Sequence, residues 1–305
     1  MRLAYLILAH AQPLQLARLV NALRCHGAVF FVHIDAKSDI SPFLEALCPT
    51  SHDDVHFVDD RAEVYWGGFG QIEATLRLMR DAMSHVPDVW RLSLISGSCY
   101  PLASNEELMG LCERPANFIS MHAVDPEGPG YERISRFHLL DHPALAMRMP
   151  REEIDRNRPL RRYINDFLNH LPPREGLGLQ YFKGSQWWSI TRETAQYVLE
   201  FCERRPEYLL RFRYSWIPDE SFFHTIIGNA SLSARRRSNL HFIDWSRDSV
   251  RNKKVLTEAA LPRILGSGRM FVRKVDQHES GPLMDRLDEI RANGRRAGRR
   301  AGSSE

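Results

Sequence analysis

Two continuous apolar runs joined by an amphipathic segment constrain the fold of this chain most strongly. Leu3–Ala9 (LAYLILA) and Ala28–Ile34 (AVFFVHI) have the length and apolar content of strands buried on both faces. Between them, Pro13–Leu23 places leucines and a valine at helical spacing. Two buried strands joined by a helix form a β-α-β unit, in which the strands are parallel and the crossover is right-handed. The sequence therefore predicts an α/β protein built on a largely parallel sheet.

Strands and helices continue to alternate after this unit. Val55–Val58 and Trp90–Ile95 are predicted to be strands, with a helix over Gln71–His85 between them. A helix over Asn105–Leu111 and a strand over Phe118–Met121 follow. This order is typical of a Rossmann-like, nucleotide-binding half.

The composition changes near Asp125, where Pro, Gly, Arg and His become frequent. We expect one domain with a mixed central sheet, followed by a helix and a disordered, solvated basic tail. The expected parts are a nucleotide-binding half at about 1–124, an acceptor and catalytic half at about 125–276, a C-terminal helix at 277–293 and the tail at 294–305.

Composition excludes several classes of protein. The chain has 305 residues, 43% hydrophobic and 26% charged, which is enough for a sizeable core. Five scattered cysteines without CxxC spacing argue against a disulfide framework and a zinc site. No run approaches the roughly 18 apolar residues of a membrane span. The net charge is +3, and the arginines of residues 291–305 allow a loose contact with an anionic membrane surface, whereas specific nucleic-acid binding is not indicated. We therefore expect a cytoplasmic protein, at most peripheral to the inner membrane face.

The ends of the first two strands indicate a nucleotide site. In open α/β sheets, ligands bind beyond the carboxyl ends of the strands. Ala9-His10-Ala11 and Asp35-Ala36-Lys37 follow the two strands, and an aspartate there can accept a hydrogen bond from a uracil ring or a ribose hydroxyl. The alternative that Asp35 and Ser38 only turn the chain stays open.

A glycine-rich segment, WGGFG, precedes the helix that begins near Gln71. Neither GxxxxGK[ST] nor GxGxxG is present, so the signal for a phosphate cradle is weak. We expect Gly68 and Gly70 to let the backbone approach a ligand or a neighbouring strand.

The stretch from Lys183 to Ile227 carries the candidate catalytic group. A buried aromatic strand over Gln186–Ile190 is followed by Thr191, which can cap a helix. Pro218 then opens a short helix with Glu220 in its first turn. The helix dipole favours an ionised carboxylate there, which makes Glu220 a candidate general base. The alternative is that Glu220 only complements the dipole.

Metal and hydrolase motifs are absent from the sequence. No D-x-D is found, and the nearest pairs, Asp53-Asp54 and Asp59-Asp60, lack its spacing. The thirteen histidines show no HExxH pattern, and no GxSxG elbow supports a serine hydrolase. His10 or His33 could act as a base, but both lie at strand ends and are more often structural. Without a metal ion, the negative charge of a diphosphate leaving group would have to be neutralised by lysine and arginine side chains.

Eight segments, taken together, carry a family resemblance. They are YLILAHAQP, FVHIDAKSD, VYWGGFGQIEA, LISGSCYPL, KGSQWWSITRE, IPDESFFHTII, LHFIDWS and GRMFVRKVD. The ordered set resembles the core-2/I-branching β-1,6-N-acetylglucosaminyltransferase family (glycosyltransferase family 14), which includes peptide O-xylosyltransferases. The resemblance implies a GT-A-like fold, a UDP-sugar donor, inversion at the anomeric carbon and no metal ion or other cofactor.

The resemblance assigns roles by position. Uridine and ribose contacts fall on Ala9-His10-Ala11 and Asp35-Ala36-Lys37, with a further nucleotide contact at Gly68 or Gly70. Glu220 matches the catalytic base.

On the donor diphosphate, the resemblance places Lys274 as one cation. Arg251 is the second when the segment is aligned without gaps, and Lys253 or Lys254 could take its place. Trp245 lies where the family contacts the acceptor, and the indoles of Trp187, Trp188 and Trp245 can stack on sugar faces. Arg247 is expected as a further acceptor contact. Core packing is the alternative for the tryptophans.

These features together predict an inverting, metal-independent glycosyltransferase. It would move GlcNAc or xylose from a UDP-sugar to a hydroxyl of a glycan, lipid-linked glycan or peptide. Because the chain lacks the anchor, stem and paired cysteines of the animal enzymes, it looks like a bacterial member. The alternatives are a non-catalytic nucleotide-sugar or glycan-binding module, and a retaining transferase or hydrolase.

Overall fold

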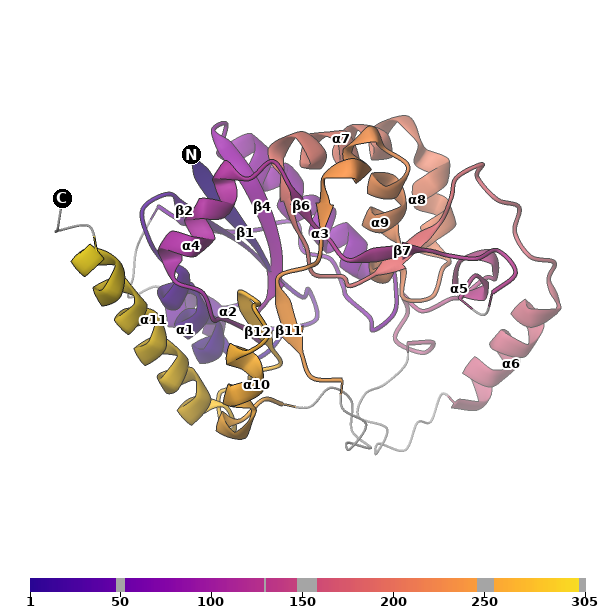
Figure 1. Cartoon of the computed structure of the whole chain (residues 1–305). Helices are drawn as coiled ribbons and strands as arrows, with labels where there is room; N and C mark the ends of the chain where they lie inside the picture. Colours follow the sequence, from indigo (N-terminus) through magenta and orange to yellow (C-terminus); the bar gives the residue numbers. More distant parts are fainter. Residues whose placement is uncertain (48–52, 129, 147–157, 246–254, 302–305) are drawn as a thin grey trace.

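A mixed seven-stranded sheet forms the centre of the molecule (Figure 1). The computed structural model describes residues 1–47, 53–128, 130–146, 158–245 and 255–301. The strand order is β10-β6-β9-β4-β1-β2-β3. In that order the strands are Arg236–Arg237, Asn117–Phe118, Ser189–Thr191, Val89–Ser96, Arg2–Ala9, Ala28–Ile34 and Val55–Phe57. Strand β9 is antiparallel to β4 and β6, while β1 is parallel to β2 and β4. The mixed α/β prediction is confirmed.

The predicted β-α-β unit is present at its predicted bounds. Helix α1 (Pro13–Leu23) joins β1 to β2, and the two strands pair in parallel from Leu3 opposite Ala28 to Ala9 opposite Ile34. Every residue of β2 is buried. A strand covered on both faces needs apolar residues at successive positions, and this explains the unbroken run AVFFVHI.

Helices cover both faces of the sheet. Along β1, Leu3, Tyr5 and Ile7 pack in one core cluster with α1, while Ala4 and Leu6 pack in a second cluster on the opposite face. Successive side chains of a strand point to opposite faces, so one strand supplies both cores. The helices on the first face include α2 (Ser41–Leu47), and those on the second are α3 (Gly70–His85), α7 (Arg192–Arg204), α8 (Pro206–Arg213) and α9 (Phe222–Gly228).

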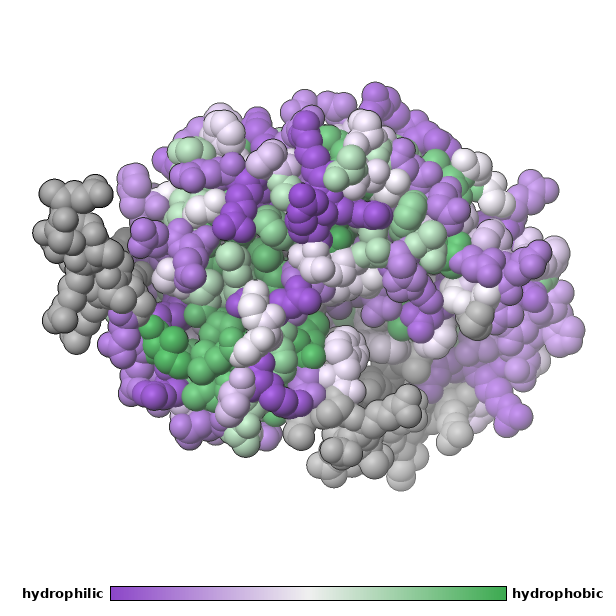
Figure 2. Space-filling view, in the orientation of Figure 1, coloured by the Kyte–Doolittle hydropathy of each residue, from purple (hydrophilic) through white to green (hydrophobic). Residues whose placement is uncertain are grey.

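Two smaller sheets flank the central one. The first contains β11 (His241–Ile243), β12 (Phe271–Arg273) and β5 (Cys99–Pro101), and the second pairs β7 (Met121–Ala123) with β8 (Phe182–Gly184). The remaining helical segments are α4 (Asn105–Met109), η2 (Gly110–Glu113), α5 (Glu132–Ser135), α6 (Arg158–His170), η3 (Pro218–Glu220), η4 (Ser231–Arg235), η5 (Glu258–Ala260), α10 (Leu261–Leu265) and α11 (Gly281–Ala301). On the face shown in Figure 2, apolar residues gather around α10 and β12, and hydrophilic residues cover α6. No helix in the described part of the chain is long and apolar enough to cross a bilayer.

Some element bounds differ from the sequence-based prediction. The strand expected at Phe118–Met121 is divided between β6 and β7, which lie in different sheets. Helix α11 begins at Gly281 because the Asp276 carboxylate accepts hydrogen bonds from the backbone N–H groups of His278 and Glu279 and forms a turn. The helix also continues to Ala301, through residues 294–301 of the expected tail. Arginine and alanine, both strong helix formers, are frequent there.

A buried arginine holds the middle of the sheet to its neighbours. Arg91 of β4 is fully buried. Its guanidinium donates to the backbone carbonyls of Leu111, Ser189, Arg114 and Ala116 at 2.8, 3.0, 2.6 and 2.9 Å. Burial lowers the pKa of Arg91 to about 10. One side chain thus satisfies four carbonyl groups, and its bonds to those of Leu111 and Ser189 are fully buried.

Replacing Arg91 with methionine should destabilise the protein by about 3 kcal/mol or more, because each buried carbonyl left without a donor costs about 1–3 kcal/mol. Urea denaturation measures the change. The matched control is Arg2→Met in β1, since Arg2 is exposed and only faces Asp88 across 3.5 Å. The control should lie within about 0.5 kcal/mol of wild type. Equal effects of the two substitutions would contradict this role of Arg91.

Candidate active site

The carboxyl ends of β1, β2 and β4 lie side by side at one edge of the sheet. The Asp35 backbone N–H donates to the Ala9 carbonyl at 2.9 Å, and the Gly97 N–H donates to the Leu8 carbonyl at 3.0 Å. The predicted strand-end residues Ala9, His10 and Asp35 are therefore brought together, as parallel pairing requires.

Asp35 both forms a turn and holds a lysine. Its carboxylate accepts from the Lys37 ammonium at 2.7 Å and from the backbone N–H groups of Lys37 and Val64 at 3.0 and 3.3 Å. The Lys37 ammonium also lies 4.4 Å from the ring centre of Tyr65. The Ser38 N–H donates to the Asp35 carbonyl at 2.8 Å, so the chain turns here. The turn at Asp35 and Ser38, which the sequence left open as an alternative, is therefore present. The mostly buried Asp35 carboxylate nevertheless lies at the sheet edge.

Positive charge reaches the same edge from the end of β12. Burial, followed by the neighbouring charge of Arg273, lowers the pKa of Lys274. Partial desolvation lowers the pKa of His10; Asp35 opposes this shift, and the charges of Lys274, Arg273 and Lys37 add to it. The Val275 N–H donates to the Ser98 carbonyl at 2.9 Å, which brings Lys274 to the edge where β1, β2 and β4 end.

Sequence reasoning did not single out Arg273. Its guanidinium donates to the hydroxyl groups of Ser96 and Ser98, the latter at 2.8 Å, at the end of β4. It also lies 4.4 Å from the ring centre of Trp187. The one sequence feature that could have indicated Arg273 as a site residue is its position next to Lys274, as a second cation in an otherwise apolar strand.

Gly68 and Gly70 allow close contacts with other segments of the protein. A Cβ atom on Gly70 would lie 2.1 Å from the Glu63 carbonyl oxygen, and one on Gly68 would lie 2.1 Å from a carboxylate oxygen of Asp141. Asp141 accepts hydrogen bonds from the backbone N–H groups of Phe69 and Gly70 at 2.7 and 3.1 Å. The Gly68 N–H donates to Tyr65. The backbone N–H groups of Gly68 and Gly70 are therefore occupied, so the nucleotide contact predicted at Gly68 or Gly70 would not use them.

Glu220 lines a cavity of about 590 Å³. It ends the turn η3, and its carboxylate is about one-third exposed. Arg133 donates to one carboxylate oxygen, Oε2, at 3.2 Å, and its guanidinium also lies 5.0 Å from the ring centre of Trp216. The side chains around it come mainly from β7, β8 and β11. The lining residues are His122, Arg133, Lys183, Gly184, Ser185, Glu220, Asn239, His241, Phe242, Ile243, Trp245 and Arg269.

The backbone just before Glu220 is strained. Ile217 has φ 51° and ψ 55°, in the left-handed region that a β-branched residue rarely adopts. Its N–H donates to the carbonyl of Gly67 at 2.9 Å, which holds the turn in place. Strain of this kind costs on the order of 1–3 kcal/mol and is concentrated at functional sites. No sequence signal indicated it.

The predicted acceptor tryptophans have different positions. Trp187 and Trp188 are 2% and 1% exposed and belong to the core, so neither can stack on an acceptor sugar, and that prediction was wrong for both. Apolar residues of α7 and α9 cover them. Trp245 is 65% exposed and lines the Glu220 cavity, so its acceptor role stays a prediction. The predicted residues Arg247, Arg251, Lys253 and Lys254 lie outside the described residues.

A layer of ring contacts leads from the cavity wall to the strand-end edge. The His241 ring on the cavity wall lies 5.8 Å from the Trp187 ring and stacks on Phe271 at 5.1 Å. Arg273 lies over Trp187. Burial and then the charges of Arg273 and Arg269 lower the pKa of His241 to about 3. His241 is therefore neutral at physiological pH, and one packed layer joins the two candidate subsites.

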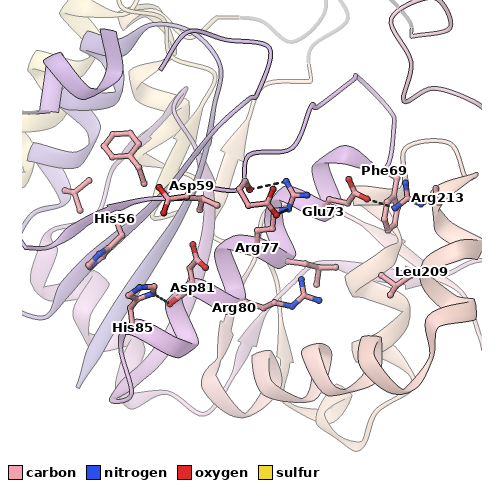
Figure 3. A pocket seen from close by; sticks show the side chains of 15 residues that line it. His56, Asp59, Phe69, Glu73, Arg77, Arg80, Asp81, His85, Leu209 and Arg213 are labelled. Carbon is pink, nitrogen blue, oxygen red and sulfur yellow. Dashed lines mark hydrogen bonds and ion pairs between the residues drawn. The ribbon is translucent and has the colours of Figure 1, made fainter. Parts of the chain in front are cut away.

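A larger cavity of about 900 Å³ lies beside β3, α3 and α8 (Figure 3). Its side chains include His56, Asp59, Asp81 and His85. Two of its carboxylates are already ion-paired, Asp60 with Arg77 and Glu73 with Arg213. None of the predicted site residues lines it. The smaller cavity beside Glu220 is therefore the candidate active site.

A family model described as Core-2/I-Branching enzyme matches residues 3–266. The chain belongs to this family. It is 27% identical over 253 residues to human xylosyltransferase 2 and 24% identical over 253 residues to rat xylosyltransferase 1, with 81% of this chain covered in both. The aligned region spans only 27% and 28% of the length of those relatives. The apo crystal structure of mouse xyloside xylosyltransferase 1 matches with a TM-score of 0.37 and 12% identity, over 89% of this chain and 96% of that one. The family predicted from the eight segments is confirmed.

The wall of this family member's candidate site depends on a buried neutral histidine. His224 of α9 is fully buried, and its Nε2 bonds the carbonyl of Ser185, a residue of the cavity lining. Burial lowers the pKa of His224 from 6.5 to about 4. A histidine whose folded pKa is lowered contributes stability that is present above pH 6.5 and is lost as the pH falls toward 4.

Replacing His224 with glutamine should therefore flatten the decline of unfolding free energy between pH 6.5 and 4. The glutamine amide can donate to the Ser185 carbonyl but cannot be protonated. Urea denaturation at several pH values across this range measures the slope. The same substitution at the exposed His26 is the control and should leave the slope unchanged. Parallel curves for wild type and His224→Gln would contradict the prediction.

Proposed function

We propose that this chain is an inverting glycosyltransferase that moves a sugar, GlcNAc or xylose, from a UDP-sugar to a hydroxyl group of a glycan, lipid-linked glycan or peptide. One observation carries the proposal: Glu220 lines a cavity that a single layer of rings joins to the sheet edge bearing Asp35 and Lys274. Membership of the Core-2/I-Branching enzyme family supports sugar transfer. The name of the xylosyltransferase relatives supports xylose as one donor sugar.

The donor would bind at the strand-end edge. Asp35 is placed to accept a hydrogen bond from uracil or ribose, and Lys274 to face the diphosphate. Arg273, held by Ser96 and Ser98, brings a second positive charge to this edge. Preorganised cations of this kind stabilise the charge that develops on a leaving diphosphate.

Glu220 would act as the general base. Its Oε2 is held by Arg133, whereas Oε1 has no hydrogen-bond partner among the residues that the structure describes. An acceptor hydroxyl can therefore donate to Oε1 and lose its proton as it attacks the anomeric carbon in line. One base and one displacement give inversion, and UDP leaves with the bonding electron pair of the glycosidic C–O bond.

We propose that the reaction needs no metal ion. The sequence lacks D-x-D, and within the described residues no group of three His, Cys, Asp or Glu side chains could hold a cation. The cations of the sheet edge offer the compensating charge instead.

Turnover should therefore be retained in excess EDTA, measured as UDP release from a UDP-sugar in the presence of an acceptor. Protein that has first been dialysed against chelator should give the same rate before and after Mn²⁺ is added. Loss of turnover in EDTA with recovery in Mn²⁺ would contradict metal independence and leave the assignment of Glu220 untouched.

Replacing Glu220 with glutamine should lower kcat by about 10²–10⁴-fold, because the amide keeps the size of the side chain but cannot accept a proton. UDP affinity should be retained, since none of the residues proposed to bind the donor lines the Glu220 cavity. Turnover, UDP binding and thermal unfolding are measured on the same samples.

The matched control is Asp219→Asn, one residue earlier in the same turn. Asp219 is 9% exposed, so its substitution should lower the unfolding temperature more than it lowers kcat. If folded Glu220→Gln protein retains turnover within about threefold of wild type, Glu220 is not the base.

A further inference from the structure

The cavity beside Glu220 carries an excess of positive charge among the lining residues that the structure describes. Its charged side chains are Arg133, Lys183, Arg269 and the single carboxylate Glu220. Arg133 and Glu220 form an ion pair at 3.2 Å and compensate each other. Lys183 and Arg269 have no carboxylate partner within the described part of the chain. Two positive charges thus remain uncompensated in a recess only partly open to water.

The two lysine and arginine side chains reach the cavity from different elements. Lys183 belongs to β8, opposite His122 of β7. Its ammonium lies 2.5 Å from where a Cβ atom on Gly130 would be, so this part of the wall has no side chain to shield it. Arg269 precedes β12, and its guanidinium donates to the Asn239 carbonyl, which fixes its direction. Two cations are therefore held apart around one space by separate segments.

A histidine on the same wall also lacks a partner. His241 is 6% exposed, and neither of its ring nitrogens has a hydrogen-bond partner among the described residues. A buried polar atom without a partner costs about 1–3 kcal/mol, and such atoms are rare in native structures. A neutral imidazole offers one donor and one acceptor, which is what a sugar hydroxyl can satisfy. This observation is independent of the charge count and also indicates a polar ligand.

We propose that the acceptor is an acidic saccharide, whose carboxylate or phosphate lies between Lys183 and Arg269 while a neighbouring hydroxyl lies at Glu220. The inference rests on the proposed function and adds the substrate class of its acceptor. An anion in this space compensates the two charges and forms charge-assisted hydrogen bonds, which are about twice as strong as neutral ones. The donor diphosphate is assigned to Lys274 and Arg273 instead, and neither of these residues is among those that line this cavity.

The first experiment compares matched acceptors. UDP release is followed with UDP-xylose and with UDP-GlcNAc, using p-nitrophenyl β-D-glucuronide, p-nitrophenyl β-D-glucoside and the 6-phosphate of that glucoside. The acidic glycosides should have at least about tenfold lower KM than the neutral one at low salt. The difference should shrink at 0.5 M NaCl, since salt screens partly exposed charges. The relative KM of the glucuronide and the 6-phosphate distinguishes a carboxylate from a phosphate as the recognised group.

The second experiment removes the charges. Lys183→Met and Arg269→Met keep an apolar stem and should each raise the KM for the acidic glycosides by about tenfold or more. The KM for the neutral glucoside should rise much less than that for the acidic glycosides, and the KM for the UDP-sugar should not change. The control is Arg204→Met in α7, an exposed arginine outside the cavity, which should change none of these values.

Binding is measured alongside turnover, so that the result does not depend on finding the best sugar. Affinities of the glucuronide and the glucoside are determined by calorimetry for the Glu220→Gln protein saturated with UDP. Tighter binding of the glucuronide, lost in Lys183→Met and Arg269→Met, supports the inference. Equal affinities, no binding of either glycoside, or an effect of these substitutions on UDP-sugar KM alone would overturn it. Failure of the proposed function would give a different result: the wild-type protein would neither bind UDP nor release it from a UDP-sugar.

Discussion

The parallel pairing of β1 with β2 and β4 is the constraint on which the rest of the structure depends. Because β1 is buried on both faces and pairs on both edges, its register fixes where the ends of three strands lie. Asp35, His10 and the serines after β4 reach one edge for that reason alone. Every other part of the candidate site is attached to this edge by β12 or is joined to it by one layer of ring contacts.

The layer formed by Trp187, His241 and Phe271 explains how two chemically different subsites share one domain. Arg273 lies against one side of it and the Glu220 cavity against the other. An indole and a neutral imidazole add no charge of their own to the space between Arg273 and the Glu220 cavity. Rigid side chains of this kind can hold a donor and an acceptor in fixed positions on the same wall, which suits a reaction in which the two meet at one bond.

The N-terminal half and the position of Glu220 in a short helical turn were predictable because their signals are local. An apolar run of strand length, a helical spacing of leucines and a proline before two carboxylates each constrain a few successive residues. The burial of Trp187 and Trp188 was not predictable in this way, because whether an indole faces a cavity or a core depends on residues of α7 and α9 that pack over it. The contacts of Arg133 and Arg273 join residues 87 and 175 positions apart, and no spacing in the sequence encodes them.

The carboxylate of Asp141 at the first turn of α3 has a consequence for how the fold can hold a diphosphate. A helix N-terminus often binds phosphate through fixed backbone donors. Here an internal anion already occupies those donors, although burial raises the pKa of Asp141. A diphosphate therefore has no access to these two N–H groups, and in the proposed donor site its charge would be balanced by the side chains of Lys274 and Arg273, whose attraction falls with ionic strength. A resident anion at one helix would in that case make donor affinity a property of the surrounding electrolyte as much as of shape.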